Sequence, residues 1–227
     1  MPVTSSAVET ASDEQQPPLA AIASHAVSGR SAASSASQPR IDTGRVRDLI
    51  FQLLGAIGEE PTREGLGGTP DRVAAWWAAF LSPETAPTST CFTESQVNGQ
   101  LVVVGGMRVW SLCEHHLLPM HLQVAAGYVP AGKVVGLSKF GRIAQRHAGR
   151  LQVQERFTRQ VAADVIGVIG SDDVAVAVRG THLCMSMRGV RMEAARTTSL
   201  HAGGRFSSDP VLSQQFLALA GIGPERE

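Results

Sequence analysis

Large apolar residues first recur with helical spacing shortly after residue 41. Between residues 42 and 58 they lie three or four positions apart, at Val46, Leu49, Ile50, Leu53, Leu54 and Ile57. This spacing predicts a helix with one apolar face, and Gly58 is placed to terminate it. A second helix is predicted from Thr69, as the cap, and Pro70, in the first helical position. Its apolar stripe includes Trp76 and Trp77, which we expect to pack in the core.

Beyond residue 83 the pattern changes to short apolar runs that predict strands. The Pro-, Thr- and Ser-rich segment 83–100 predicts a loop, and strands follow at 101–104 and 107–111, separated by two glycines. Further strands are predicted at 124–129, 134–137, 174–178 and 184–187. Helical spacing returns at 139–147, in a longer helix that carries Phe157 and Val161, and after the cap formed by Asp209 and Pro210. Helices, strands, helices, strands and a last helix are typical of an α+β domain.

Composition limits the domain organisation. Residues 1–40 are rich in Ser, Ala, Gln and Pro with few large apolar residues, which predicts a disordered tail. A transit peptide is the alternative, but Glu9, Asp13 and Glu14 do not suit one. The remaining residues, 41–227, are long enough for one catalytic domain, with N-terminal helices at 41–82 and a core at 100–227.

Charge and hydropathy exclude several classes of partner. Lys+Arg and Asp+Glu both number 20, so no overall basic charge favours nucleic-acid binding. No apolar run is long enough to cross a membrane and no export signal is visible, so we expect no membrane association and a cytoplasmic location. The three cysteines are an odd number, which favours metal binding or simple burial over a disulfide framework.

Cysteine and histidine spacing suggests a metal site. Cys113 and His116 lie three positions apart, so both side chains can reach one ion if the segment turns. Cys184, which follows a histidine by two positions, is the candidate third ligand. A Cys-His-Cys set favours zinc and leaves a fourth position open for water. Two alternatives remain, a chance Cys-x-x-His pair and a structural zinc site completed by His115 or His182. Cys91 is interpreted as an ordinary thiol.

Four motifs resemble the GTP cyclohydrolase I family. They are the segments 111–116, 136–139, 150–156 and 182–190, which read SLCEHH, GLSK, RLQVQER and HLCMSMRGV. The resemblance extends from residue 61 to residue 206, which is nearly everything after the predicted tail. It implies a T-fold, or tunnelling fold, in which an antiparallel sheet carries helices on one face and follows the N-terminal helices. It also implies a homo-oligomeric ring, usually a decamer, with active sites across subunit boundaries.

The resemblance also implies a role for each motif residue. The metal ligands would be Cys113, His116 and Cys184, holding Zn²⁺. His115 and His182 would transfer protons and Ser138 would assist the later sugar rearrangement. The substrate would be GTP, bound by Gln154 and Glu155 at the guanine and by Lys139, Arg142 and Arg188 at the triphosphate. From charge alone, Glu155 reads as an ordinary acidic residue of a first helical turn, and the basic residues as solvated surface.

The implied reaction opens the imidazole ring of GTP, releases formate and gives 7,8-dihydroneopterin triphosphate, the first step of tetrahydrofolate or pterin biosynthesis. Three rival hypotheses remain: the same chemistry in a deazapurine or secondary-metabolite pathway, a T-fold enzyme that reduces a nitrile, and a zinc-stabilised binding protein without activity. This chain departs from the family pattern at Leu122, Ala125 and the segment 194–199. These departures bear on the pathway more than on the chemistry.

Overall fold

The computed structural model describes residues 41–82, 86–93 and 98–222. The predicted tail, residues 1–40, lies outside the described residues. Within these ranges, no helix combines the length and the apolar character that crossing a membrane requires.

Two helices open the described chain. Helix α1 spans Thr43–Ala56, and the Asp42 side chain caps it by accepting a hydrogen bond from the Arg45 backbone N–H. Helix α2 spans Thr69–Phe80 with Gly68 as its N-cap, so the predicted cap Thr69 is wrong by one residue. The two helices contact each other, yet α1 buries none of its residues and Trp76 remains 45% exposed. Core packing was therefore the wrong expectation for Trp76.

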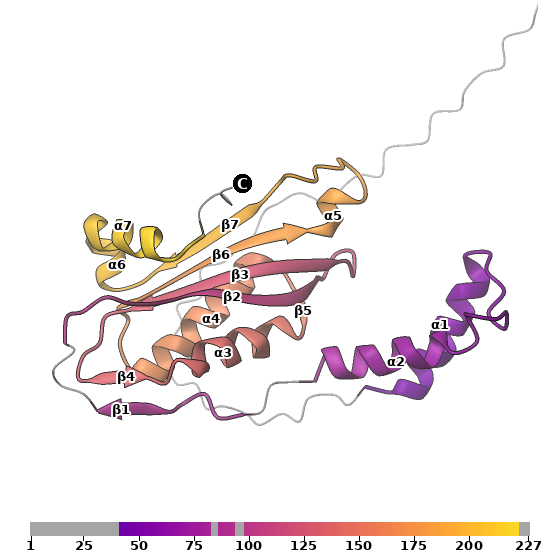
Figure 1. Ribbon diagram of the computed structural model, residues 1–227, viewed down its shortest axis with the longest axis horizontal. Helices are drawn as coiled ribbons and strands as arrows, with labels where there is room; N and C mark the ends of the chain where they lie inside the picture. The colour runs from indigo at the N-terminus through magenta and orange to yellow at the C-terminus, as the bar shows by residue number, and fades with distance from the viewer. Residues whose placement is uncertain (1–40, 83–85, 94–97, 223–227) are drawn as a thin grey trace, which may run out of the picture. The chain divides into compact units, whose positions relative to one another are not determined.

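A five-stranded sheet forms the centre of the fold (Figure 1). Its strands are β2 (Val102–Cys113), β3 (Pro119–Tyr128), β5 (Leu151–Gln152), β6 (Val174–His182) and β7 (Thr197–Ala202). The spatial order is β5-β2-β3-β6-β7, in which only the short β5 pairs in parallel. A separate antiparallel pair joins β1 (Cys91–Thr93) to β4 (Lys133–Val135). The sheet is thus mixed, although nearly all of its pairing is antiparallel.

Helices α3 (Ser138–Ala148) and α4 (Gln154–Ile169) form the main core with one face of the sheet. Valines alternate along β6, and Val174, Val176 and Val178 point into this core together with Phe157 of α4. All four side chains are fully buried, as period-two alternation requires of a sheet covered on that face. The predicted helices at 139–147 and around Phe157 are confirmed.

The other face is partly covered by α6 (Arg205–Ser208) and α7 (Pro210–Leu219). The alanines that alternate with the valines of β6 lie on this face, where Ala175 and Ala177 contact a second cluster containing Phe206 and Phe216. Alanine leaves room for the close approach of α7, which begins at the predicted Asp209 cap. The expectation of helices on one face only is therefore wrong.

Two predictions about the strands differ from the structure. The glycines at 105 and 106 do not separate two strands; they form an irregularity within β2, between Val104 and Met107, where Gly106 has φ of +70°. The predicted strand at 184–187 is instead the helical turn α5 (Leu183–Ser186). The short run of apolar residues around Cys184 does not distinguish a strand from one helical turn, and α5 buries none of its residues.

Candidate metal and catalytic site

The turn between β2 and β3 presents the first motif. The Cys113 backbone N–H donates to Leu118 O at 2.9 Å, and the Leu117 N–H donates to Cys113 O at 2.9 Å. Leu117 has φ of +55°, a conformation that is uncommon for a residue with a side chain and that clusters at functional sites. This tight turn brings the imidazoles of His115 and His116 back beside the Cys113 sulfur, at 3.8 and 3.6 Å from Nδ1 of each ring.

Sheet register brings the second motif to the same place. Met120 at the start of β3 pairs with His182 at the end of β6, and α5 follows at once. As a result, ligand atoms of Cys113, His116 and Cys184 all lie within 4.8 Å of one another. The three residues predicted to bind a metal are therefore brought together by the fold.

The geometry of this group fits zinc. Bonds of about 2.3 Å to sulfur and about 2.0 Å to nitrogen at a tetrahedral angle separate the two ligand atoms by about 3.5 Å, close to the 3.6 Å between Cys113 Sγ and His116 Nδ1. Burial raises the pKa of the Cys184 thiol, and the nearby Cys113 sulfur raises it further. Without a metal, Cys184 therefore favours the protonated thiol. A divalent cation would instead favour the thiolate, because the thiolate is the form that binds a metal. Within the described residues, neither His115 nor His182 belongs to the group, so the donor set is that of an open site.

Gln154 orients His182. The Gln154 side chain is 1% exposed, and its amide nitrogen lies 3.0 Å from both Val178 O and Thr197 O. Because the amide nitrogen donates to these carbonyls, the Gln154 oxygen must accept the 2.8 Å hydrogen bond from His182 Nε2. His182 Nε2 therefore carries a proton, and Nδ1 keeps its lone pair.

Electrostatics around His182 favour the neutral ring. Burial lowers the pKa of His182, and the carboxylate of Glu155 opposes part of this shift. Glu155 is an exposed residue of the first turn of α4. Glu155 thus lies close enough to His182 to stabilise the protonated ring, and its carboxylate remains accessible to a ligand.

Arg188 lies beside the metal group. Its Nη1 is 2.7 Å from His116 Nε2, so the guanidinium donates to the ring nitrogen that faces away from Cys113. This contact fixes the lone pair of His116 on Nε2 in the structure described here.

Three predicted residues lie elsewhere. Ser138, Lys139 and Arg142 belong to the first turns of α3, next to β4, whose Val135 N–H donates to the Tyr128 hydroxyl at the far end of β3. The other end of α3 leads into β5, which pairs with Leu112 and Cys113. Eleven residues of helix span about 16 Å. The fold therefore separates these residues from the metal group by the length of α3.

An ion pair that the sequence did not single out supports the turn. Arg156 pairs with Glu114, and it also donates to Gln152 Oε1 and Leu151 O at 2.9 Å each. The hydrogen bond from Arg156 lowers the pKa of Glu114. Both residues lie inside the motifs quoted above, but their spacing of 42 positions gave no sign of a contact.

Fold and site together define a class of enzyme. An α+β domain that gathers two thiols and three imidazoles at one end of its sheet has the donor chemistry of a metal-dependent hydrolase. The comparisons with known proteins narrow this class. The sequence profile of GTP cyclohydrolase I matches residues 46–221, and the chain belongs to the GTP cyclohydrolase I family.

Relatives in distant organisms agree. The protein named GTP cyclohydrolase 1 of Hyperthermus butylicus is 44% identical over 176 residues, which cover 77% of this chain and 89% of the relative. Its namesake in Chlorobaculum tepidum is 40% identical over 184 residues, 78% of this chain and 81% of the relative. That of Deinococcus radiodurans is 40% identical over 173 residues, 75% and 80% of the two chains.

Proposed function

We propose that this protein hydrolyses GTP to 7,8-dihydroneopterin triphosphate and formate, using a zinc ion held by Cys113, His116 and Cys184. The proposal depends on one observation above all. In a member of this family, Cys113 and His116 of one segment and Cys184 of a distant segment bring their ligand atoms within 4.8 Å of one another. When bound, zinc supplies the Lewis acidity that activates water for hydrolysis near neutral pH.

His182 has the arrangement of a proton acceptor. Its Nε2–H is held by Gln154, so Nδ1 is free to take a proton from the reacting centre and return it. The lowered pKa of His182 keeps the ring neutral before reaction. His115, with a side chain 63% exposed, is the second proton-transfer group and can reach a ligand above the turn.

Glu155 provides guanine recognition. Its carboxylate can accept from the ring N–H and the amino group of guanine as a charge-assisted pair. We assign Gln154 a positioning role at the same subsite, because its buried amide already bonds to His182 and to two backbone carbonyls.

Zinc binding at Nδ1 and the Arg188 contact at Nε2 require opposite tautomers of His116. If Nδ1 gives its lone pair to zinc, the neutral ring carries its proton on Nε2, and Arg188 can no longer donate there. The guanidinium, now without this acceptor, becomes available to the substrate triphosphate. Metal binding would thus prepare Arg188 for the anion.

Lys139, Arg142 and Ser138 would reach the substrate from a second copy of the chain. They lie about a helix length from the metal group of their own subunit, so a complete site requires assembly. The sheet has edges available for this assembly, since β7 and most of β2 pair on one side only within the described residues. Unpaired edges tend to join neighbouring chains, and we propose a T-fold ring of the family type, with a decamer as the expected size.

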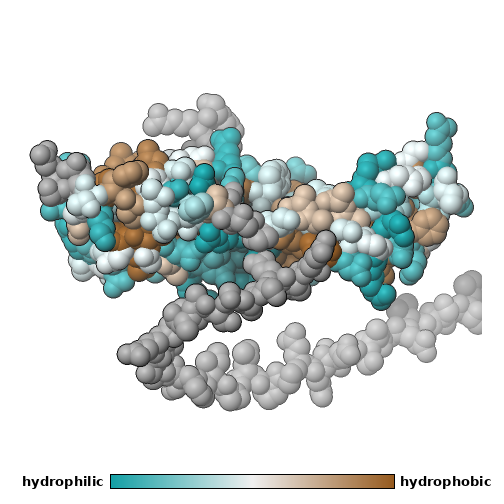
Figure 2. All heavy atoms as spheres, turned by 90° about the horizontal axis from the view of Figure 1, so that it is seen from below, coloured by the Kyte–Doolittle hydropathy of each residue, from teal (hydrophilic) through white to brown (hydrophobic). Residues whose placement is uncertain are grey.

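Exposed apolar surface is consistent with assembly. Phe92, Leu137 and Leu200 are at least half exposed, and hydrophobic patches separated by hydrophilic surface are visible on the face shown in Figure 2. Apolar patches of this kind mark protein–protein contacts.

The function is tested by incubating purified, zinc-loaded protein with GTP. We expect release of formate and, after oxidation, pterin fluorescence. Cys113→Ser should abolish both, whereas Cys91→Ser is the matched control, because the Cys91 thiol lies at 3.4 Å from Val168 O and takes no part in the metal group. Absence of formate from zinc-replete protein would refute the proposal.

A further inference from the structure

Helix α4 carries a polar residue at every fourth position along one face, namely Arg156, Gln160 and Asp164. Residues four apart are neighbours on the surface of a helix, so these side chains form a polar row. Both ends of the row have partners outside α4. Arg156 pairs with Glu114 of the turn between β2 and β3, and the Asp164 carboxylate lies 2.9 Å from His147 Nε2 in the last turn of α3. The row thus contacts both the end of α3 and the turn that carries the first metal motif.

The Gln152 side chain of β5 lies between these two contacts and is 2% exposed. Its amide nitrogen lies 3.0 Å from His147 O and 2.8 Å from Gln160 Oε1, so both amide hydrogens have acceptors. The amide oxygen accepts the 2.9 Å hydrogen bond from Arg156 Nε. A buried amide with these three partners holds the Arg156 guanidinium in one orientation.

This orientation directs Arg156 at the metal-binding turn. Its Nη2 donates to the Glu114 carboxylate and, at 2.9 Å, to Leu151 O. Glu114 directly follows the proposed ligand Cys113, and the Glu114 backbone N–H donates to Gln152 O at 3.0 Å. Gln152 therefore holds the main chain of Glu114 directly and its side chain through Arg156.

The turn needs such contacts because its backbone is strained. Leu117 has φ of +55°, a conformation that persists in a residue other than glycine only where the surroundings fix it. The Leu117 residue is 52% exposed, so packing of its own side chain contributes little. The ion pair between Glu114 and Arg156 connects the turn to the rigid body of α4 instead.

We propose that Gln152 and Arg156 are positioning residues of the metal site, which hold Cys113 and His116 in the geometry that zinc requires. This inference rests on the zinc site of the proposed function. Residues behind the ligands of a metal typically change its affinity about 10- to 100-fold. Arg156 reaches the ligands only through Glu114, and we expect an effect near the lower end of this range.

Charge and positioning predict opposite results for the loss of Arg156. A bound dication repels a nearby cation, so charge alone predicts that Arg156→Met strengthens zinc binding. Loss of positioning predicts weaker binding, because zinc would have to order the turn at the moment it binds. The sign of the change in affinity therefore separates the two effects.

The test measures the zinc affinity of the full-length protein by competition with a chromophoric chelator, in the absence of GTP. We expect Arg156→Met to bind zinc about 10-fold more weakly than the wild type, and Gln152→Met to change in the same direction. Arg156→Lys should recover part of the loss, because an ammonium group can pair with Glu114 but lacks the planar fork that also reaches Gln152. Arg159→Met is the matched control, since Arg159 is an exposed arginine of the same helix, and it should bind zinc like the wild type.

Zinc binding by Arg156→Met that is unchanged or tighter would overturn the proposal. A double-mutant cycle then tests the route through Glu114. If Arg156 acts through this carboxylate, the losses from Glu114→Gln and Arg156→Met should not add; fully additive losses would also overturn the proposal.

Circular dichroism checks that each variant folds. If Gln152→Met does not fold, the Arg156 variants decide the question, because the Arg156 side chain is 34% exposed and its replacement leaves no buried cavity. Formate release from GTP is measured separately. A wild type that binds zinc and releases no formate would contradict the proposed function and leave the positioning result standing.

Discussion

Two inactive variants should restore activity when they are assembled together. One carries Cys113→Ser and lacks the metal group, and the other, the clamp variant, carries Lys139→Gln with Arg142→Gln. Each keeps the half of the site that the other lacks. The structure separates these halves by the length of α3 within one chain, so an intact site can form only where a metal group of one copy meets the α3 start of a neighbour.

The expected recovery follows from chance assembly. In a ring formed from equal amounts of the two variants, half of the metal groups are intact and half of the α3 starts are intact. If neighbours are chosen at random in such head-to-tail contacts, about one site in four combines two intact halves. Formate release should therefore reach about a quarter of the wild-type rate, whereas each variant alone should show almost none.

The assay co-expresses the two chains with different affinity tags and purifies the mixed assemblies through both tags in turn. A matched control pairs Cys113→Ser with Cys184→Ser, where both lesions fall in the metal half and no intact site can form. The shared-site reasoning is wrong if the complementary mixture is as inactive as this control. It is also wrong if the clamp variant alone retains the wild-type rate.

Three further results are expected. Cys184→Ser should lose bound zinc and turnover together because it removes one of three protein donors; full zinc content by metal analysis would contradict this. Glu155→Gln should raise KM for GTP about 10- to 100-fold, because a neutral amide replaces a charged acceptor, and an unchanged preference for GTP over ATP would count against the assignment. Asp164→Asn should lower the free energy of unfolding in urea by about 1 kcal/mol at pH 7, since His147 Nε2 lies 2.9 Å from the carboxylate and its hydrogen bond lowers the pKa of Asp164. That contribution is complete above the ordinary Asp pKa of about 4 and disappears as pH falls through the lowered value, so the variant and the wild type should converge in acid.

Local signals in the sequence predicted the helices well. The Asp209 cap and the glycine after α1 act through contacts a few residues apart, and both are present in the structure. Strand limits were predicted less well, because pairing depends on distant residues. β7 was not predicted at all, since Thr197 to Ala202 contains few large apolar residues and is a strand through its pairing with β6.

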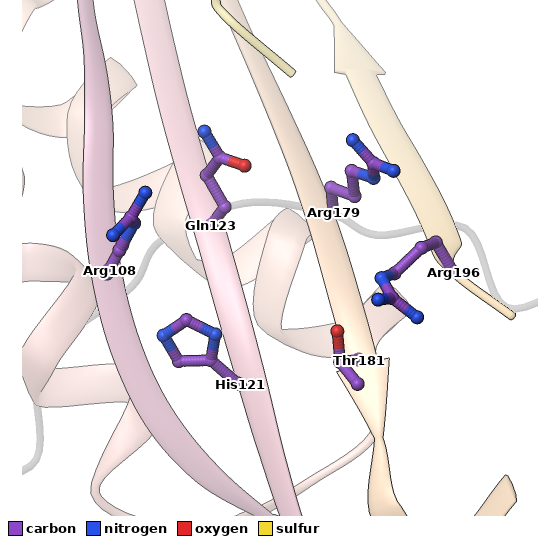
Figure 3. A pocket seen from close by; sticks show the side chains of 6 residues that line it. All are labelled: Arg108, His121, Gln123, Arg179, Thr181 and Arg196. Carbon is purple, nitrogen blue, oxygen red and sulfur yellow. The ribbon is translucent and has the colours of Figure 1, made fainter. Parts of the chain in front are cut away.

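The same limit applies to the metal group and to a hollow on the sheet, which is lined by Arg108, His121, Gln123, Arg179, Thr181 and Arg196 (Figure 3). Cys113 and His116 could be paired from their spacing because a single turn joins them, and Cys184 could be named as a candidate third ligand from its thiol and the nearby His182, but its place beside them depends on sheet pairing. The hollow has no such signal, since Arg108, His121 and Arg179 look like ordinary polar positions of alternating strands. Only the register of β2, β3 and β6 gathers them on one face.

Gln154 shows how the fold connects the two motifs chemically. Its position at the start of α4 places a buried amide between β6 and β7, where the backbone carbonyls of Val178 and Thr197 occupy its donors. A carboxylate at this position could not donate to those carbonyls, and an apolar residue could neither donate to them nor accept from His182. The amide satisfies both carbonyls and has one acceptor left, which holds the proton of His182 on Nε2. The lone pair of Nδ1 is thus fixed by the packing of α4 on the sheet, before any substrate is bound.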